Sequence, residues 1–94
     1  METVTLTAHA ETRANQRGIR RETMAILLDY GVAKIRGGAE VIFMDQAARR
    51  KAREDLGDKV YARIERALDA YLVVAEDGRV MTCAHRRKPL RFRN

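Results

Sequence analysis

The sequence predicts a small α+β domain in which an N-terminal helical hairpin packs on a four-stranded antiparallel sheet. Two patterns lead to this prediction. Apolar residues recur at helical spacing before residue 31, and short runs typical of strands, paired around glycine turns, come after it. A polar stretch with helical character separates the two predicted β-hairpins and forms a helical insert. With 94 residues, the chain is expected to be a single domain, 1–94.

The first element is predicted to be a helix over residues 8–17, with Thr7 as its N-cap. Gly18 follows where helices commonly end in the left-handed conformation. Ile19 then stands where such an ending places an apolar contact, here onto Ala14. The first helix therefore has both of its ends marked in the sequence.

The second element, RETMAILLDY over residues 21–30, has its apolar residues at helical spacing, and Gly31 ends it. After Gly31 the apolar residues no longer recur at helical spacing, and the pattern becomes that of strands. The runs VAKIR and AEVIFM flank Gly37 and Gly38, which is the turn signal of a β-hairpin.

Asp45 is predicted to cap a mostly polar helix, QAARRKARED. Gly57 interrupts it, and Asp58 is predicted to cap a further helical stretch, KVYARIERAL. The last runs, AYLVVA and RVMTCAH, surround Glu76, Asp77 and Gly78 and predict the second β-hairpin.

The charge of the chain favours polyanionic partners. The net charge is +6 and the isoelectric point is about 10.1, which favours nucleic acid, an anionic membrane or an acidic protein. Residues 86–94 are predicted to be a basic C-terminal tail without an acidic residue. In this tail Arg86, Arg87 and Lys88 could hold a phosphate, or the tail could simply be solvated.

Several function classes are not expected. The chain has no apolar run near the roughly 18 residues of a membrane helix, and its start does not read as a signal peptide. Cys83 is alone, which excludes an internal disulfide and a zinc site built on cysteine pairs. The sequence therefore predicts a cytoplasmic protein that uses no membrane, metal ion or cofactor.

His9, Arg13 and Arg17 are spaced by four and form one row on the predicted first helix. A helical wheel puts this row beside the small residues Ala10 and Ala14, on the side that packs toward the rest of the domain. Two interpretations stay open. The arginines could pair with carboxylates and tie the helix to the sheet, or they could face a cleft that binds a phosphate backbone.

The same wheel puts Glu11 and Asn15 on the opposite side of the helix. In the phosphate interpretation, a neutral His9 beside Arg13 could take a proton from a 2′-hydroxyl group while the arginines hold the phosphate. This arrangement predicts ribonuclease chemistry.

His85 is the only other histidine and lies on the last predicted strand. Strand alternation puts Cys83 and His85 on one face and Val80, Thr82 and Ala84 on the other. Thr82 and His85 therefore cannot face one cleft unless the strand bulges or ends early. In the alternative interpretation, His85 is a half-exposed residue whose ring nitrogens form structural hydrogen bonds and have no role in function.

The motif HAETRANQRGI, the helix ending LLDYG and the hairpin YLVVAEDGRVMTCAHR resemble a bacterial and phage family, domain of unknown function 4258. That family is in turn similar to compact toxin domains of the RelE and barnase type. Those domains place two helices before a curved antiparallel sheet and cleave RNA without a metal ion. The resemblance therefore implies a toxin-type endoribonuclease.

The resemblance and the residue patterns together give a candidate site. His9 would act as general base, Arg13 and Arg17 would bind the scissile phosphate, and His85 or a water molecule would protonate the leaving oxygen. The candidate substrate-binding residues are Gln16, Thr82, Arg86, Arg87 and Lys88.

Three functions compete. The first is a metal-independent endoribonuclease of toxin type that acts on RNA and is held by an acidic, antitoxin-like partner protein. The second is a non-catalytic nucleic-acid-binding or regulatory module that uses the basic tail. The third is a small protein whose basic surface docks on an acidic partner. The sequence does not indicate an oligomeric state.

Overall fold

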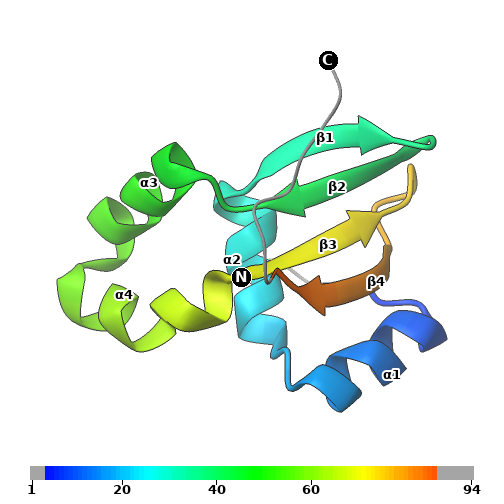
Figure 1. Cartoon of the computed structure of the whole chain (residues 1–94), viewed down its shortest axis with the longest axis horizontal. Coiled ribbons are helices and arrows are strands. Elements are labelled where there is room, and N and C mark those ends of the chain that lie inside the picture. Colours follow the sequence, from blue (N-terminus) through cyan, green and yellow to red (C-terminus); the bar gives the residue numbers. More distant parts are fainter. Residues whose placement is uncertain (1–3, 87–94) are drawn as a thin grey trace.

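The computed structural model describes residues 4–86 as helices packed on a four-stranded antiparallel sheet (Figure 1). The elements are α1 (Ala8–Arg17), α2 (Arg21–Tyr30), β1 (Val32–Arg36), β2 (Ala39–Phe43), α3 (Gln46–Leu56), α4 (Asp58–Ile64), the 3₁₀ turn η1 (Glu65–Leu68), β3 (Ala70–Val74) and β4 (Val80–His85). The predicted α+β fold is confirmed, including the helical insert between the two β-hairpins.

Both ends of α1 have the predicted cap chemistry. The Thr7 Oγ1 accepts a hydrogen bond from the Ala10 amide at 3.1 Å. At the other end Gly18 has a φ of 66°, and the Ile19 amide donates to the Ala14 carbonyl at 2.9 Å. This ending satisfies a free carbonyl of the last turn and directs the chain into α2.

The sheet is a meander with the strand order β1-β2-β3-β4. Gly37 and Gly38 have φ values of 59° and 80°, as a two-residue type I′ hairpin turn requires at both of its central positions. Between β3 and β4 the register shifts, because Val74 pairs with Val80 whereas Val73 pairs with Thr82. The residue left between them is a β-bulge, which changes the face to which the start of β4 points.

The helical insert begins as predicted, since the Asp45 carboxylate accepts a hydrogen bond from the Ala48 amide at 2.8 Å. The predicted cap at Asp58 is wrong. Helix α4 begins at Asp58 itself, with Gly57 before it and no side-chain cap. The Asp58 carboxylate instead accepts a hydrogen bond from Arg53 Nε at 2.8 Å, which links α3 to α4.

The hydrophobic core lies between the helices and one face of the sheet. Helix α1 packs along β4, and α2 packs against β2 and β3 (Figure 1). The largest fully buried side chains are those of Met24, Leu27, Met44, Leu68, Leu72, Val80 and Cys83. Among residues 4–86, no helix combines the length and apolar character needed to cross a bilayer.

Candidate nucleic-acid interface

Helix α1 is held along β4 by contacts at its start. The Thr7 amide donates to the Val80 carbonyl at 3.0 Å, and the Thr7 hydroxyl donates to the Met81 carbonyl at 3.2 Å. The buried residues of α1, Ala10 and Ala14, are small and allow a close approach of helix to strand. The side chains of α1 are therefore held in a defined position relative to β4.

The row of His9, Arg13 and Arg17 is more exposed than predicted. His9 and Arg17 are exposed, and only Arg13 is half-buried. Within residues 4–86, neither arginine forms an ion pair with a carboxylate. The ion-pair interpretation is therefore not realised in this part of the chain. Both guanidinium groups have donors that can bind an anion from solution.

The fold brings His85 to the end of α1. Its ring Nε2 lies 2.6 Å from the Arg17 carbonyl oxygen. Because a carbonyl oxygen only accepts hydrogen bonds, Nε2 carries the hydrogen, and a neutral His85 keeps its lone pair on Nδ1. Arg13 lies one helical turn before Arg17 on the same row of α1. We call Arg13, Arg17 and His85 the α1–β4 cluster, because the Arg17 main chain contacts His85 and both arginines lie on the row of α1 that ends there.

His9 lies at the opposite end of α1. It is eight positions from Arg17, which corresponds to about 12 Å along the helix axis. His9 and His85 are therefore not brought together at one phosphate. Gln16 precedes Arg17 and is exposed, so it can reach a ligand bound at the α1–β4 cluster.

The register of β4 turns Thr82 away from this cluster. Cys83 and His85 point to the core side of the sheet, and Thr82 points to the other side, as predicted. Val80 was expected on the face of Thr82, but it shares the face of Cys83. The reason is the bulge at Met81, which shifts the alternation between Val80 and Thr82. The strand alternates regularly from Thr82 to His85, so these two side chains remain on opposite faces.

Arg86 is held away from the α1–β4 cluster. Its Nη1 donates to the Met44 carbonyl at 2.8 Å, and its guanidinium carbon lies 5.2 Å from the centroid of the Phe43 ring. Arg86 is thus directed toward β2. Two further candidate phosphate-binding residues lie outside the described part of the chain, namely Arg87 and Lys88.

The Cys83 thiol belongs to the packing of α1 on β4. Burial raises its pKa, although the positive charge of Arg17 acts in the opposite direction. Its Sγ lies 3.9 Å from the Ala10 carbonyl, to which it can donate weakly. The thiol is therefore protonated at neutral pH and is a packing group. In the described chain, no three or more His, Cys, Asp or Glu side chains are grouped as metal ligands.

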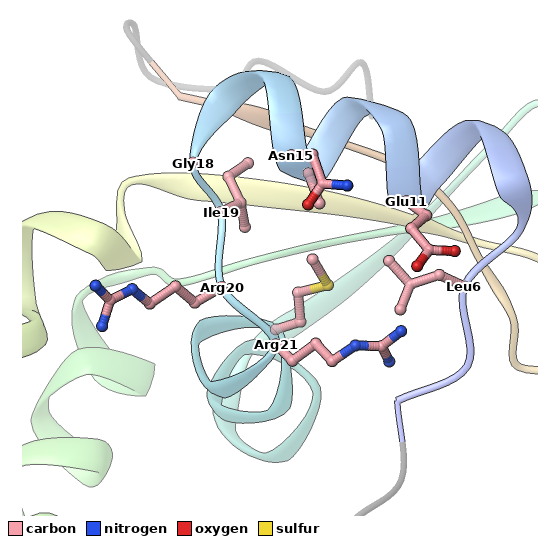
Figure 2. Close-up of a pocket in the computed structure, with 9 residues that line it drawn as sticks. Leu6, Glu11, Asn15, Gly18, Ile19, Arg20 and Arg21 are labelled. Atoms are coloured by element: carbon pink, nitrogen blue, oxygen red, sulfur yellow. The ribbon is translucent and has the colours of Figure 1, made fainter.

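A cavity between α1 and α2 was missed by the sequence analysis. It measures about 580 Å³, and Figure 2 shows the residues that line it. Its apolar wall consists of Leu6, Ala14, Ile19 and Met24. Glu11 and Asn15 line it from α1, and Arg21, whose Nη1 donates to the Val4 carbonyl at 2.8 Å, lines it from α2.

The wheel of α1 alone could not have located this cavity. The wheel puts Glu11 and Asn15 on the side opposite the His9 row, but it does not show that the start of α2 lies across a cavity from them. Glu11 and Arg21 face one another across the opening (Figure 2), and they form no ion pair within the described residues.

Comparison of the chain with protein-family models, with curated proteins and with solved structures finds no match. The resemblance of its opening motif to the domain of unknown function 4258 family stays a prediction. A functional proposal must therefore be built on the chemistry of the α1–β4 cluster.

Proposed function

We propose that this protein is a metal-independent endoribonuclease of toxin type that binds RNA at the α1–β4 cluster. One observation carries the proposal: two guanidinium groups, from Arg13 and Arg17, lie one turn apart without a carboxylate partner in residues 4–86, beside an oriented histidine. Unpaired guanidinium groups bind phosphate in bidentate fashion. The overall charge of +6 adds to the attraction of a polyanion.

In this proposal, His85 is the general base. Its Nδ1 accepts the proton of the 2′-hydroxyl group while the 2′-oxygen attacks phosphorus and the bond from phosphorus to the 5′-oxygen breaks. The leaving 5′-oxygen takes a proton from water. Arg13 and Arg17 stabilise the negative charge that develops on the non-bridging phosphate oxygens. His9, about 12 Å along the helix, would contact a neighbouring part of the RNA.

RNA cleavage in the presence of a metal chelator tests this assignment. The His85→Gln variant should cleave at least about 100-fold more slowly, because the loss of a general base has effects of this size or larger. Changing Arg13 and Arg17 to Gln should weaken both binding and cleavage. The matched control is Arg50→Gln, since Arg50 is exposed on α3 and far along the chain from the cluster. At saturating RNA the His9→Ala variant should cleave at nearly the normal rate, because His9 contributes a binding contact and not the base.

Equal cleavage by the wild type and the His85 variant would contradict the proposal. A large loss of cleavage activity in the His9→Ala variant would instead assign the general base to His9. The second candidate, a non-catalytic nucleic-acid-binding module, rests on the same unpaired arginines. It predicts salt-dependent binding without cleavage. The slope of the logarithm of the binding constant against the logarithm of salt concentration should decrease by about one for each phosphate contact removed.

A further inference from the structure

In the described part of the chain, the outer edge of β1 is open for main-chain pairing. Strand β1 is the first strand of the sheet, and among residues 4–86 its one pairing partner is β2. Within residues 4–86, no backbone hydrogen bond reaches its outer side. The opposite edge is different, because Val80 of β4 exchanges hydrogen bonds with Thr5 and Thr7 and α1 lies alongside (Figure 1).

The side chains of β1 alternate between positive charge and apolar surface. Lys34 and Arg36 share one face of the sheet, and Ile35 points to the other. All three are exposed, and Ile35 is 72% exposed, the largest value among the large hydrophobic residues of the described chain. Neither cation has an ion-pair partner within residues 4–86.

We propose that β1 is the docking edge for an acidic extended segment of a protein partner, which adds to the sheet as a fifth strand. Main-chain hydrogen bonds supply the affinity in this mode of recognition, and alternate side chains supply the specificity. Acidic residues of the segment would stand opposite Lys34 and Arg36, and an apolar residue opposite Ile35. Opposite charges that face each other across paired strands stabilise the pair.

The same charges disfavour a second copy of this chain as the occupant. An antiparallel pair of β1 edges centred on Lys34 puts this lysine opposite its own equivalent. A pair centred on Ile35 puts Lys34 opposite Arg36. Like charges directly opposite one another destabilise strand pairing, and charged edge strands commonly prevent self-association in this way.

A nucleic acid is also a poorer occupant of this edge than an acidic strand. Its phosphates could contact Lys34 and Arg36, but they would leave Ile35 and the outward main-chain groups without partners. An extended peptide uses all three features. The inference therefore goes beyond the proposed RNA chemistry and does not depend on it.

Amide hydrogen exchange followed by NMR tests the inference with a synthetic peptide of alternating Glu and Val residues. With the peptide at about ten times its Kd, the outward amides of β1 should exchange about tenfold more slowly, because only about one-tenth of the protein is then free. A Lys-Val peptide of the same length should have no effect. A variant with Lys34→Glu and Arg36→Glu should reverse this preference, which also demonstrates that it is folded.

The control changes Arg50 and Lys59, two exposed cations of the helical insert, to Glu and so has the same net charge as the reversed variant. It should retain the response to the Glu-Val peptide. The inference is overturned if β1 is not protected in the wild type, or if the control loses protection as fully as the reversed variant. Neither result bears on RNA cleavage, which the α1–β4 variants test separately.

Discussion

Gly31 joins α2 to β1, and we expect its replacement by alanine to destabilise the fold. Gly31 has φ −66° and ψ 160°, an extended conformation that any residue adopts. A Cβ at this position would lie 2.4 Å from the Leu27 carbonyl oxygen and 2.7 Å from Ile42 Cγ2. The oxygen belongs to the last turn of α2 and cannot rotate away, so the helix and the sheet would have to separate.

Overpacking of this kind costs about 1–3 kcal/mol, and contact with a backbone atom places Gly31→Ala in the upper part of that range. For a domain of this size, a loss of about 2–3 kcal/mol lowers Tm by roughly 10–20 °C. Urea unfolding followed by circular dichroism measures the loss. The matched comparison is Gly18, whose φ is 66° and whose added Cβ would meet no atom within 4 Å.

The two glycines should respond differently to asparagine. Gly18→Ala should cost about 1 kcal/mol because of the left-handed backbone, and Gly18→Asn should recover most of it, since Asn tolerates that conformation. Gly31→Asn should be at least as destabilising as Gly31→Ala, because both introduce the same Cβ. If Gly31→Ala stays within about 0.5 kcal/mol of the wild type, or if asparagine rescues Gly31, the steric argument is refuted.

Three further results are expected. Hydrogen bonds from Arg79 lower the pKa of the Asp77 carboxyl, so its contribution to stability is present above the unfolded-state pKa and is lost as pH falls through the folded-state pKa. Urea unfolding should therefore find Asp77→Asn less stable than the wild type at neutral pH, with a difference that disappears in acid. The buried Cys83 thiol, whose pKa is raised, should react with iodoacetamide far more slowly than a free thiol until urea unfolds the protein. In sedimentation velocity, the variant with Lys34→Glu and Arg36→Glu should pair with the wild type, whereas each alone stays monomeric.

Local signals in the sequence were sufficient to locate most of the fold. Thr7, Gly18 and Asp45 each act on backbone groups within about four residues of their own position. The glycine pair at the first hairpin likewise determines its turn within the turn itself. Such features follow from residue type and spacing alone, which explains why the element bounds were predicted closely. The predicted cap at Asp58 was wrong because Gly57 and Asp58 are adjacent, and residue spacing does not decide which of them precedes the helix.

The candidate site depended on contacts that local signals do not contain. The separation of His9 from His85 depends on which end of α1 meets the end of β4. The role of Glu11 at a cavity depends on where α2 packs. The face of Val80 depends on the bulge at Met81, for which an alternating run of residues gives no signal. The residue types were therefore identified, but their grouping was not.

The two proposed surfaces lie on opposite edges of the sheet, and their separation leads to a further prediction. Three strand spacings, about 14 Å, lie between β1 and β4. Electrostatic effects decay over about 8 Å at 0.15 M salt but over about 30 Å at 0.01 M. A Glu-Val peptide bound at β1 should therefore leave RNA affinity at the α1–β4 cluster unchanged at the higher salt and weaken it at the lower one. Fluorescence anisotropy with labelled RNA measures both. A loss of affinity at 0.15 M salt would mean that the acidic segment occupies the α1–β4 cluster instead of the edge of β1.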